Sequence, residues 1–184
     1  MEPHRKHLEE PVESITAVSG RTTRKLKPIS HATQTMYSEG AEFLVLGELL
    51  IRGIHATKSY TGFTGWDVLA ANPRTGKTAR IQVKARLATD FDGGFPIKNV
   101  ESDFVVLVAL NRGYRYRFKH RRESGVRPVE YFVIPIASVK KAIKKGRTWG
   151  NMPKVHLRQL EIDKAELRNN WKVVQQFLGV RSEF

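Results

Sequence analysis

Residues 65–86 read Gly-Trp-Asp-Val-Leu-Ala-Ala-Asn-Pro-Arg-Thr-Gly-Lys-Thr-Ala-Arg-Ile-Gln-Val-Lys-Ala-Arg. From Ala79 to Arg86 apolar and polar side chains alternate, which is the period of a β-strand with two unlike faces. The segment Asn72–Lys77 contains Asn, Pro and Gly, which are typical of a turn. The stretch therefore predicts a β-hairpin, with one strand ending at Ala71 and the other beginning at Thr78.

This hairpin brings three polar side chains to one face. With a turn over 72–77, Asp67 pairs with Gln82 across the two strands, and Lys84 lies diagonal to Asp67. A carboxylate, an amide oxygen and an ammonium group then converge. Carboxylate and amide oxygens are ligands that suit a hard divalent cation. The arrangement predicts a functional site.

These residues resemble the PD-(D/E)xK nuclease superfamily, which includes many restriction enzymes and the archaeal-type Holliday junction resolvases. Asp67 matches the acidic position of its motif, and Gln82-Val83-Lys84 matches the (D/E)xK position, with Gln in place of the acid. Trp66 stands where the motif name has Pro. The resemblance covers roughly residues 38–139 and implies an α/β fold: a restriction-endonuclease-like core with a central mixed β-sheet flanked by helices.

The resemblance also implies a chemistry. Asp67 would bind Mg²⁺ directly, the Gln82 amide oxygen and the Val83 carbonyl would complete the protein ligands, and Glu42 would bind directly or through water. Lys84 would orient the attacking water, lower its pKa, or neutralise charge that develops on the phosphate. Because Gln82 removes one negative charge, weaker Mg²⁺ binding is expected, and Mn²⁺ could substitute.

The segment from Ser38 to Arg52 predicts the helix that would precede these strands, and Gly53 is a plausible C-terminal stop. Two acids on it could serve the site. At about 100° per residue, Glu42 lies within the apolar stripe and Glu48 well off it, so Glu42 is the preferred candidate. The alternative is that Glu42 only complements the helix dipole. The apolar stripe consists of Val45, Leu46, Leu49 and Leu50.

The positive charge is concentrated in one part of the sequence. The formal net charge is +14, and residues 112–158 hold fourteen Lys or Arg against Glu123 and Glu130. A charge run of this kind is usually a solvated face, but this concentration favours a polyanion partner, with nucleic acid first because phosphate contacts dominate such binding.

Two clusters account for most of this charge. The first, in a predicted hairpin insertion over 112–129, alternates aromatic and basic residues from Tyr114 to Lys119 and is either an edge strand packed by its rings or an arm that grips DNA. The second follows the strand 130–136 on a short helix expected to begin near Ala137. The candidate phosphate-binding residues are Arg115, Arg117, Lys119, Arg121, Arg122, Lys140, Lys141, Lys144, Lys145 and Arg147.

Length and composition fit one globular domain. The chain has 184 residues and no cysteine, which leaves no disulfide or thiolate zinc site. Residues 1–36 are expected to form a flexible basic arm, residues 37–184 the nuclease-like domain, and residues 163–178 a C-terminal helix. The apolar run Phe104–Leu110 suits a buried central strand and is too short to cross a membrane. A cytoplasmic protein with no organic cofactor is expected.

The sequence thus predicts a Mg²⁺-dependent endonuclease acting on duplex or branched DNA, and cleavage of both strands would favour a homodimer. Two alternatives stay open: a catalytically weak or inactive nucleic-acid-binding protein or subunit built on a nuclease fold, and an RNA-directed nuclease. The recognised sequence or structure, and a role in restriction, junction resolution, repair or a mobile element, are not readable from these residues.

Overall fold

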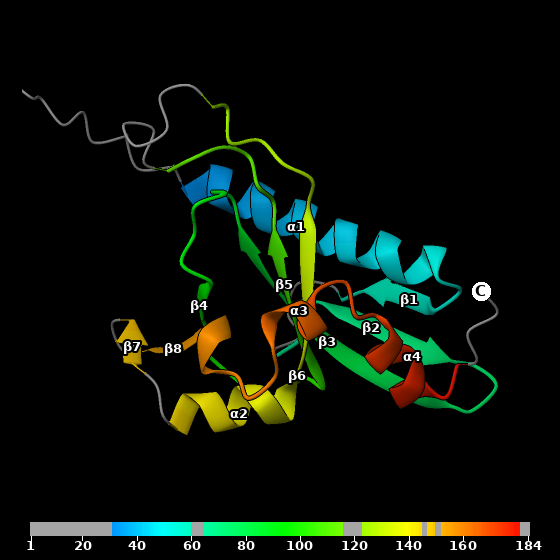
Figure 1. Cartoon of the computed structure of the whole chain (residues 1–184). Coiled ribbons are helices and arrows are strands. Elements are labelled where there is room, and N and C mark those ends of the chain that lie inside the picture. Colours follow the sequence, from blue (N-terminus) through cyan, green and yellow to red (C-terminus); the bar gives the residue numbers. More distant parts are fainter. Residues whose placement is uncertain (1–30, 60–64, 116–122, 145–146, 150–151, 181–184) are drawn as a thin grey trace, which may run out of the picture.

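The computed structural model describes residues 31–59, 65–115, 123–144, 147–149 and 152–180 (Figure 1). Its helices are α1 (His31–Ile51), α2 (Ile136–Lys144), α3 (Lys164–Leu167) and α4 (Lys172–Leu178). Its strands are β1 (His55–Lys58), β2 (Val68–Asn72), β3 (Lys77–Arg86), β4 (Gly94–Pro96), β5 (Phe104–Ala109), β6 (Glu130–Pro135), β7 (Arg147–Trp149) and β8 (Met152–His156).

The main sheet has five strands in the order β1-β2-β3-β5-β6. The pair β3–β5 is parallel and the other neighbours are antiparallel, so the sheet is mixed. A small second sheet has the order β4-β8-β7. The predicted α/β class, with a central mixed sheet flanked by helices, is confirmed.

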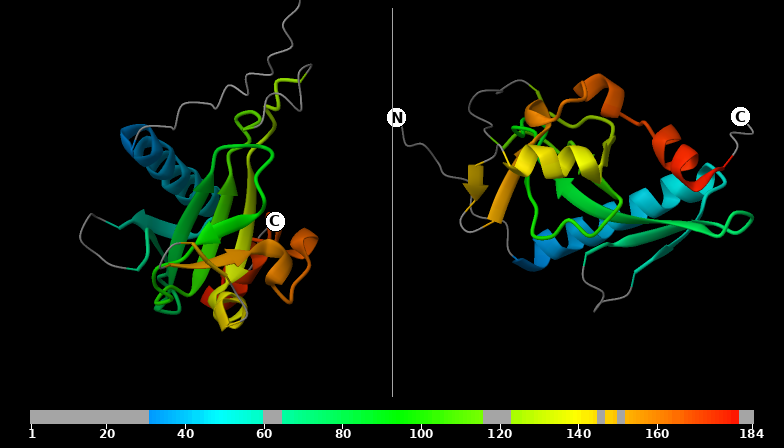
Figure 2. Two further views of the ribbon diagram at one scale, coloured as in Figure 1. Left: turned by 90° about the vertical axis from the view of Figure 1, so that its left-hand side faces the viewer. Right: turned by 90° about the horizontal axis from the view of Figure 1, so that it is seen from below.

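The main sheet lies between two apolar layers. On one face, Val45 and Leu49 of α1 and Val174 of α4 pack in one core with the inward side chains of β2 and β3. On the other face, Val139 of α2 and Val155 of β8 belong to a second core against β5 and β6. Figure 2 shows α1 and α2 on opposite sides of the sheet.

The hairpin predicted from residues 65–86 is confirmed in its register. Val68 pairs with Ile81, and Asn72 pairs with Lys77. Gly76 has φ +70°, a left-handed conformation that glycine adopts without steric cost, so it suits the turn. Since the register is fixed by the turn, the alternation of side chains is fixed with it.

The strand β5 is buried at every residue. It lies between β3 and β6 and has an apolar layer on each face, which is why its sequence is continuously apolar rather than alternating. The buried central strand predicted at Phe104–Leu110 is therefore correct. Within the described residues, no helix has the length and apolar character needed to span a membrane.

Helix α1 is longer than predicted. It includes His31–Tyr37, so the proposed boundary of the flexible arm at residue 36 is wrong, while residues 1–30 lie outside the described residues. Extending an existing helix costs far less than starting one, which lets a polar segment without apolar period continue it. Leu50 was expected to face the sheet but is 51% exposed. The helix is followed by Gly53, with φ +69°, as expected for a C-terminal stop.

The single C-terminal helix expected over 163–178 is instead two helices, α3 and α4. Asp163 caps α3, because its Oδ1 accepts from Ala165 N at 2.7 Å. The break follows from Asn169, which has φ +52° and donates its N–H to the Tyr131 carbonyl of β6. A tertiary hydrogen bond to the sheet thus interrupts a segment that is apolar at helical spacing.

The predicted basic hairpin is described only at its base. Arg112 and Val126 form an antiparallel bridge, and residues 116–122 lie outside the described residues. Tyr114 is 9% exposed and its hydroxyl donates to Glu123 at 2.7 Å. For this ring the structure supports packing rather than stacking on bases.

The basic region is continuous in sequence but divided in space. Residues 112–129 connect the end of β5 to the start of β6, whereas α2 follows the end of β6. Because β5 and β6 are antiparallel, these two segments lie at opposite ends of the strands (Figure 1). Helix α2 begins at Ile136, close to the predicted start, and Arg147 belongs to β7 rather than to this helix.

The central position of β5 predicts a large cost for a cavity there. Leu107 is fully buried, so Leu107→Ala is expected to lower the free energy of unfolding by about 2–5 kcal/mol. Met152→Ala is the control, since Met152 is 41% exposed and is expected to change it by less than about 0.5 kcal/mol. Urea denaturation of both variants measures the difference, and equal costs would contradict this packing.

Candidate active site

The site lies where β3 extends beyond the end of its neighbour β2. Within the described residues, pairing of the two strands ends at Val68–Ile81, whereas β3 continues to Arg86. We call this place the β2–β3 fork. Asp67 occupies it: its N–H donates to the Ile81 carbonyl at 2.8 Å, and its Oδ2 accepts from Val83 N at 2.6 Å. The Asp67 carboxylate therefore takes a position along β3 where a strand would otherwise pair.

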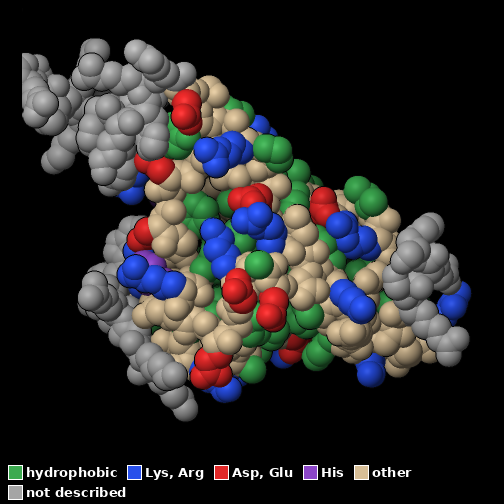
Figure 3. All heavy atoms as spheres, viewed as in Figure 1, with side chains coloured by type: hydrophobic (Ala, Val, Ile, Leu, Met, Phe, Trp, Pro, Cys, Tyr) green, Lys and Arg blue, Asp and Glu red, His purple; other side chains and the backbone are tan. Residues whose placement is uncertain are grey.

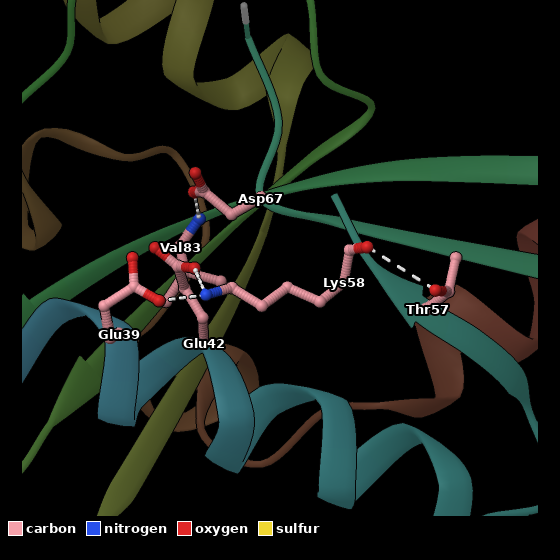
Figure 4. Close-up of polar contacts among 6 residues, drawn as sticks. All are labelled: Glu39, Glu42, Thr57, Lys58, Asp67 and Val83. Atoms are coloured by element: carbon pink, nitrogen blue, oxygen red, sulfur yellow. Dashed lines mark hydrogen bonds and ion pairs between the residues drawn. The ribbon is translucent and has the colours of Figure 1, made fainter. Parts of the chain in front are cut away.

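Helix α1 and strand β1 bring three charged groups next to the fork. The Lys58 ammonium is 3.1 Å from Glu42 Oε2 and also pairs with Glu39. Figure 4 shows this ammonium between the two carboxylates, with Asp67 and Val83 beside them. Lys58 is the last residue of β1 and pairs with Val68, which follows Asp67, so the β1–β2 register sets its place.

The structure separates the two acids that were candidates on α1. Glu48 pairs with Arg52 on the same helix. Glu42 is electrostatically coupled to Asp67 and Lys84. Glu42 thus lies near the fork, while Glu48 is engaged elsewhere; a direct role for Glu42 in binding a cation stays a prediction.

Gln82 is the most informative residue of the fork. Its side chain is 7% exposed, and its Nε2 donates to Asn99 Oδ1 at 3.5 Å. Its Oε1 is buried and has no hydrogen-bond partner among the described residues. A buried acceptor without a partner costs about 1–3 kcal/mol, so this oxygen is available to a group outside the described residues.

Burial perturbs the titration of three charged groups at or beside the fork, namely Asp67, Glu42 and Lys84. It raises the pKa of Asp67, which the Val83 N–H and Lys84 oppose, and it raises the pKa of Glu42, which Lys58 opposes. Burial also lowers the pKa of Lys84, against the attraction of Asp67. Perturbed carboxylates beside an amine of lowered pKa are typical of functional sites.

The donor groups fit a hard divalent cation in their chemistry. Asp67, Glu42 and Gln82 offer oxygen atoms, and the orphaned Gln82 Oε1 is one of them. Among the described residues, however, no three His, Asp or Glu side chains are grouped closely enough to hold a metal by themselves. A cation here would therefore rely on the amide oxygen and the Val83 carbonyl as well as on carboxylates.

The hairpin pattern in the sequence predicts Asp67, Gln82 and Lys84 but does not include Lys58 and Glu39. Glu39 precedes Glu42 by three residues, a spacing that puts both on one side of a helix and could have indicated it. Nothing in the four-residue strand β1 marks Lys58, because its role depends on the docking of β1 beside α1.

The candidate phosphate-binding residues are only partly described. Arg115 and Lys140 are exposed, whereas Lys141 pairs with Glu161 at 2.9 Å. The side chains of Lys144 and Arg147 are outside the described part of the chain, as are Arg117, Lys119, Arg121, Arg122 and Lys145. Their contact with nucleic acid stays a prediction.

Comparison with known proteins gives structural matches only. No protein-family model and no curated protein matches the sequence. One similar structure is the bacterial homing endonuclease I-Ssp6803I, with 14% identity, a TM-score of 0.49, and coverage of 83% of this chain and 99% of that chain. Another is Hjc, a Holliday junction resolvase from the archaeal hyperthermophile Archaeoglobus fulgidus, with 17% identity, a TM-score of 0.40, and coverage of 67% and 86%.

The order of elements expected from the PD-(D/E)xK resemblance is present in the structure of this chain. A helix carrying Glu42, a strand that begins after Asp67, and a strand carrying Gln82-Val83-Lys84 follow one another in a mixed sheet, as predicted from the sequence. The chemistry of the site is inferred from this chain's own residues.

The orphaned amide oxygen generates a stability prediction. Gln82→Met keeps the length of the side chain and removes the unsatisfied acceptor, so the free energy of unfolding is expected to stay equal or to rise by up to about 2 kcal/mol. Thermal unfolding without divalent ions measures it, with Gln175→Met on α4 as control. A fall in the free energy of unfolding of more than about 1 kcal/mol would show that the Gln82 amide stabilises the protein without any ligand.

Proposed function

We propose that this protein is a divalent-metal-dependent endonuclease that hydrolyses DNA phosphodiester bonds. One observation carries the proposal: Gln82 on β3 has a buried oxygen without a partner among the described residues, and the next residue, Val83, binds the Asp67 carboxylate, which attracts the Lys84 amine. Oxygen donors beside an amine of lowered pKa suit the charge that forms when a phosphodiester is attacked.

Mg²⁺ is the cation that this donor set would hold, with Mn²⁺ as a substitute. Asp67 and Gln82 would bind it, together with the Val83 carbonyl, and Glu42 would bind directly or through water. When bound, such a cation supplies electrostatic stabilisation of the phosphate and of the attacking oxygen.

Lys84 would act on the water and the phosphate. Because burial lowers the pKa of its amine, the cost of keeping it neutral is smaller than for an exposed lysine. A neutral amine can accept a proton from the attacking water, and a charged one can neutralise the phosphate. Asp67 favours the charged form, so either role is within reach of the same group.

Glu39 and Lys58 would support Glu42 rather than react. The Lys58 ammonium neutralises both acids of α1 and holds the Glu42 carboxylate beside the fork. Without this ion pair, two acids one helical turn apart would repel each other near Asp67.

DNA is the proposed substrate because of the basic residues. Arg115 and Lys140 are exposed, and they lie in segments at opposite ends of β5 and β6. Contacts at both ends of these strands would suit a long polyanion better than a small anion. Phosphate contacts carry no sequence information, so they position the substrate only.

A non-catalytic nucleic-acid-binding subunit is the second candidate. Two observations favour it: Glu42 is already paired with Lys58, and no group of three acids or histidines within the described ranges could hold a metal. An RNA-directed nuclease is the third candidate, since the phosphate chemistry is shared.

The first test is removal of the amine or the acid. Lys84→Gln and Asp67→Ala are each expected to lower the cleavage rate of supercoiled DNA by ~100-fold or more, because the first removes the amine that would act on the water or the phosphate and the second removes a ligand of the cation. DNA affinity in a gel-shift assay should change little. Lys77→Gln is the matched control, since Lys77 is an exposed lysine at the other end of β3.

The substrates and ions used decide among the three candidates. Supercoiled, linear and branched DNA and a matched RNA are incubated with Mg²⁺, Mn²⁺ or EDTA. Cleavage that EDTA abolishes supports the proposal, and preference for RNA supports the third candidate. Binding without cleavage under every condition would leave the non-catalytic subunit, and full activity of Lys84→Gln would refute the assigned site.

The Gln at position 82 generates a second prediction. Gln82→Glu adds a carboxylate, so Mg²⁺ affinity measured by titration calorimetry is expected to rise about tenfold or more, equivalent to about 1.4 kcal/mol. Without the cation the variant should unfold at a lower temperature, because a buried carboxylate near Asp67 is costly. Unchanged affinity would show that residue 82 is not a ligand.

A further inference from the structure

Helix α1 leaves an apolar stripe in solvent on the side away from the sheet. Its buried residues are Ala41, Val45 and Leu49. The stripe consists of Met36 (72% exposed), Tyr37 (39%), Phe43 (59%), Leu44 (38%), Leu50 (51%) and Ile51 (79%). These six form two rows that repeat every seven residues, 36-43-50 and 37-44-51. Figure 3 shows the face turned toward the viewer in Figure 1, where Lys, Arg, Asp and Glu side chains are interspersed with apolar ones.

Two glycines lie along the middle of this stripe. At about 100° per residue, Gly40 and Gly47 fall between the two rows. A Cβ added to either glycine would meet nothing within 4 Å, so packing among the described residues does not require them. Each costs about 0.5–1 kcal/mol relative to Ala in a helix. Small residues at a contact let two helices approach closely, which gives these glycines a purpose when a second helix lies on the stripe.

The exposed area is large enough for a stable contact. With about 200 Å² for a large apolar side chain, the exposed fractions leave roughly 700 Å² on one copy. The largest apolar patch on a typical monomer is about 300–600 Å². A standard protein interface buries about 800 Å² on each partner, so the stripe comes close to that size.

The stripe is complementary to itself when two copies run antiparallel. With a two-fold axis between residues 43 and 44, the Phe43 rings meet each other, as do the Leu44 side chains, and Gly40 faces Gly47. Met36 then faces Leu50, and Tyr37 faces Ile51. Every residue of the stripe gains a partner from the same set, which is the property of an isologous interface.

A hollow beside the stripe distinguishes the antiparallel from the parallel arrangement. Its volume is about 540 Å³, and it is lined by Met36, Tyr37, Gly40, Leu44, Leu110 and Arg112. An antiparallel copy brings Leu50 and Ile51, which are both exposed at the C-terminal end of the stripe, to this hollow. In a parallel pair, the residues that line the hollow would face the same residues of the second copy, and the hollow would stay unfilled.

We propose that the protein is a homodimer formed by antiparallel packing of the two α1 helices through this stripe. The interface touches the candidate site without being part of it: the Lys58 ammonium lies 4.9 Å from the centre of the Phe43 ring. Burial of Phe43 by the second copy removes water from one side of the Lys58–Glu42 ion pair. The dimer thus joins two sites through their supporting residues.

Oligomeric state tests the proposal. The full chain is expected to run as a dimer at micromolar concentration by light scattering, and Ile51→Glu is expected to run as a monomer with an unchanged circular dichroism spectrum. Met152→Glu is the control, since Met152 is 41% exposed on β8, and it should stay dimeric. A monomeric wild-type chain, or a dimer that Ile51→Glu leaves intact, would overturn the proposal.

Orientation is tested by cross-linking, which is clean because the chain has no cysteine. Oxidation of a mixture of Met36→Cys and Leu50→Cys chains is expected to give a covalent dimer, and each variant alone is not. In one helix these positions are about 21 Å apart, too far for a disulfide. Linkage of Met36→Cys to itself would mean a parallel pair. If the full chain is a monomer and dimerises only after residues 1–30 are removed, that segment covers the stripe and the proposal is wrong.

Discussion

The structure depends on a difference in length between the neighbouring strands β2 and β3. Pairing of β2 with β3 ends at Val68–Ile81, and β3 continues to Arg86 beside β5. The Val83 N–H therefore needs another acceptor on its β2 side, and the Asp67 carboxylate supplies it. One hydrogen bond thus satisfies the backbone and fixes a charged group beside Gln82 and Lys84.

The β2–β3 fork allows side chains from opposite faces of the main sheet to come near one another. Gln82 and Lys84 alternate with Val83, whose side chain packs in the core beneath α1. Because β2 begins only at Val68, Glu42 of α1 is electrostatically coupled to Asp67 and Lys84.

The two opposite faces of helix α1 lie in different environments. One face buries Val45 and Leu49 against the sheet, which carries Glu42 to the fork. The other holds the exposed stripe with Gly40 and Gly47 along its centre. Sequence analysis treated the helix as amphipathic with a single apolar stripe and so placed Leu50 against the sheet. A helix that is apolar on two sides has a weak amphipathic signal, which is why its exposed face went unnoticed.

The sequence by itself determined the hairpin, its register, the buried central strand, and hence the neighbours Asp67, Gln82 and Lys84, because strand alternation and turn chemistry act over a few residues. Only the tertiary structure decided the remaining features: the engagement of Glu42 by Lys58, the break at Asn169, and the division of the basic region between two ends of the sheet. Each depends on contacts between segments far apart in the chain, where local propensity carries no information about which partners meet.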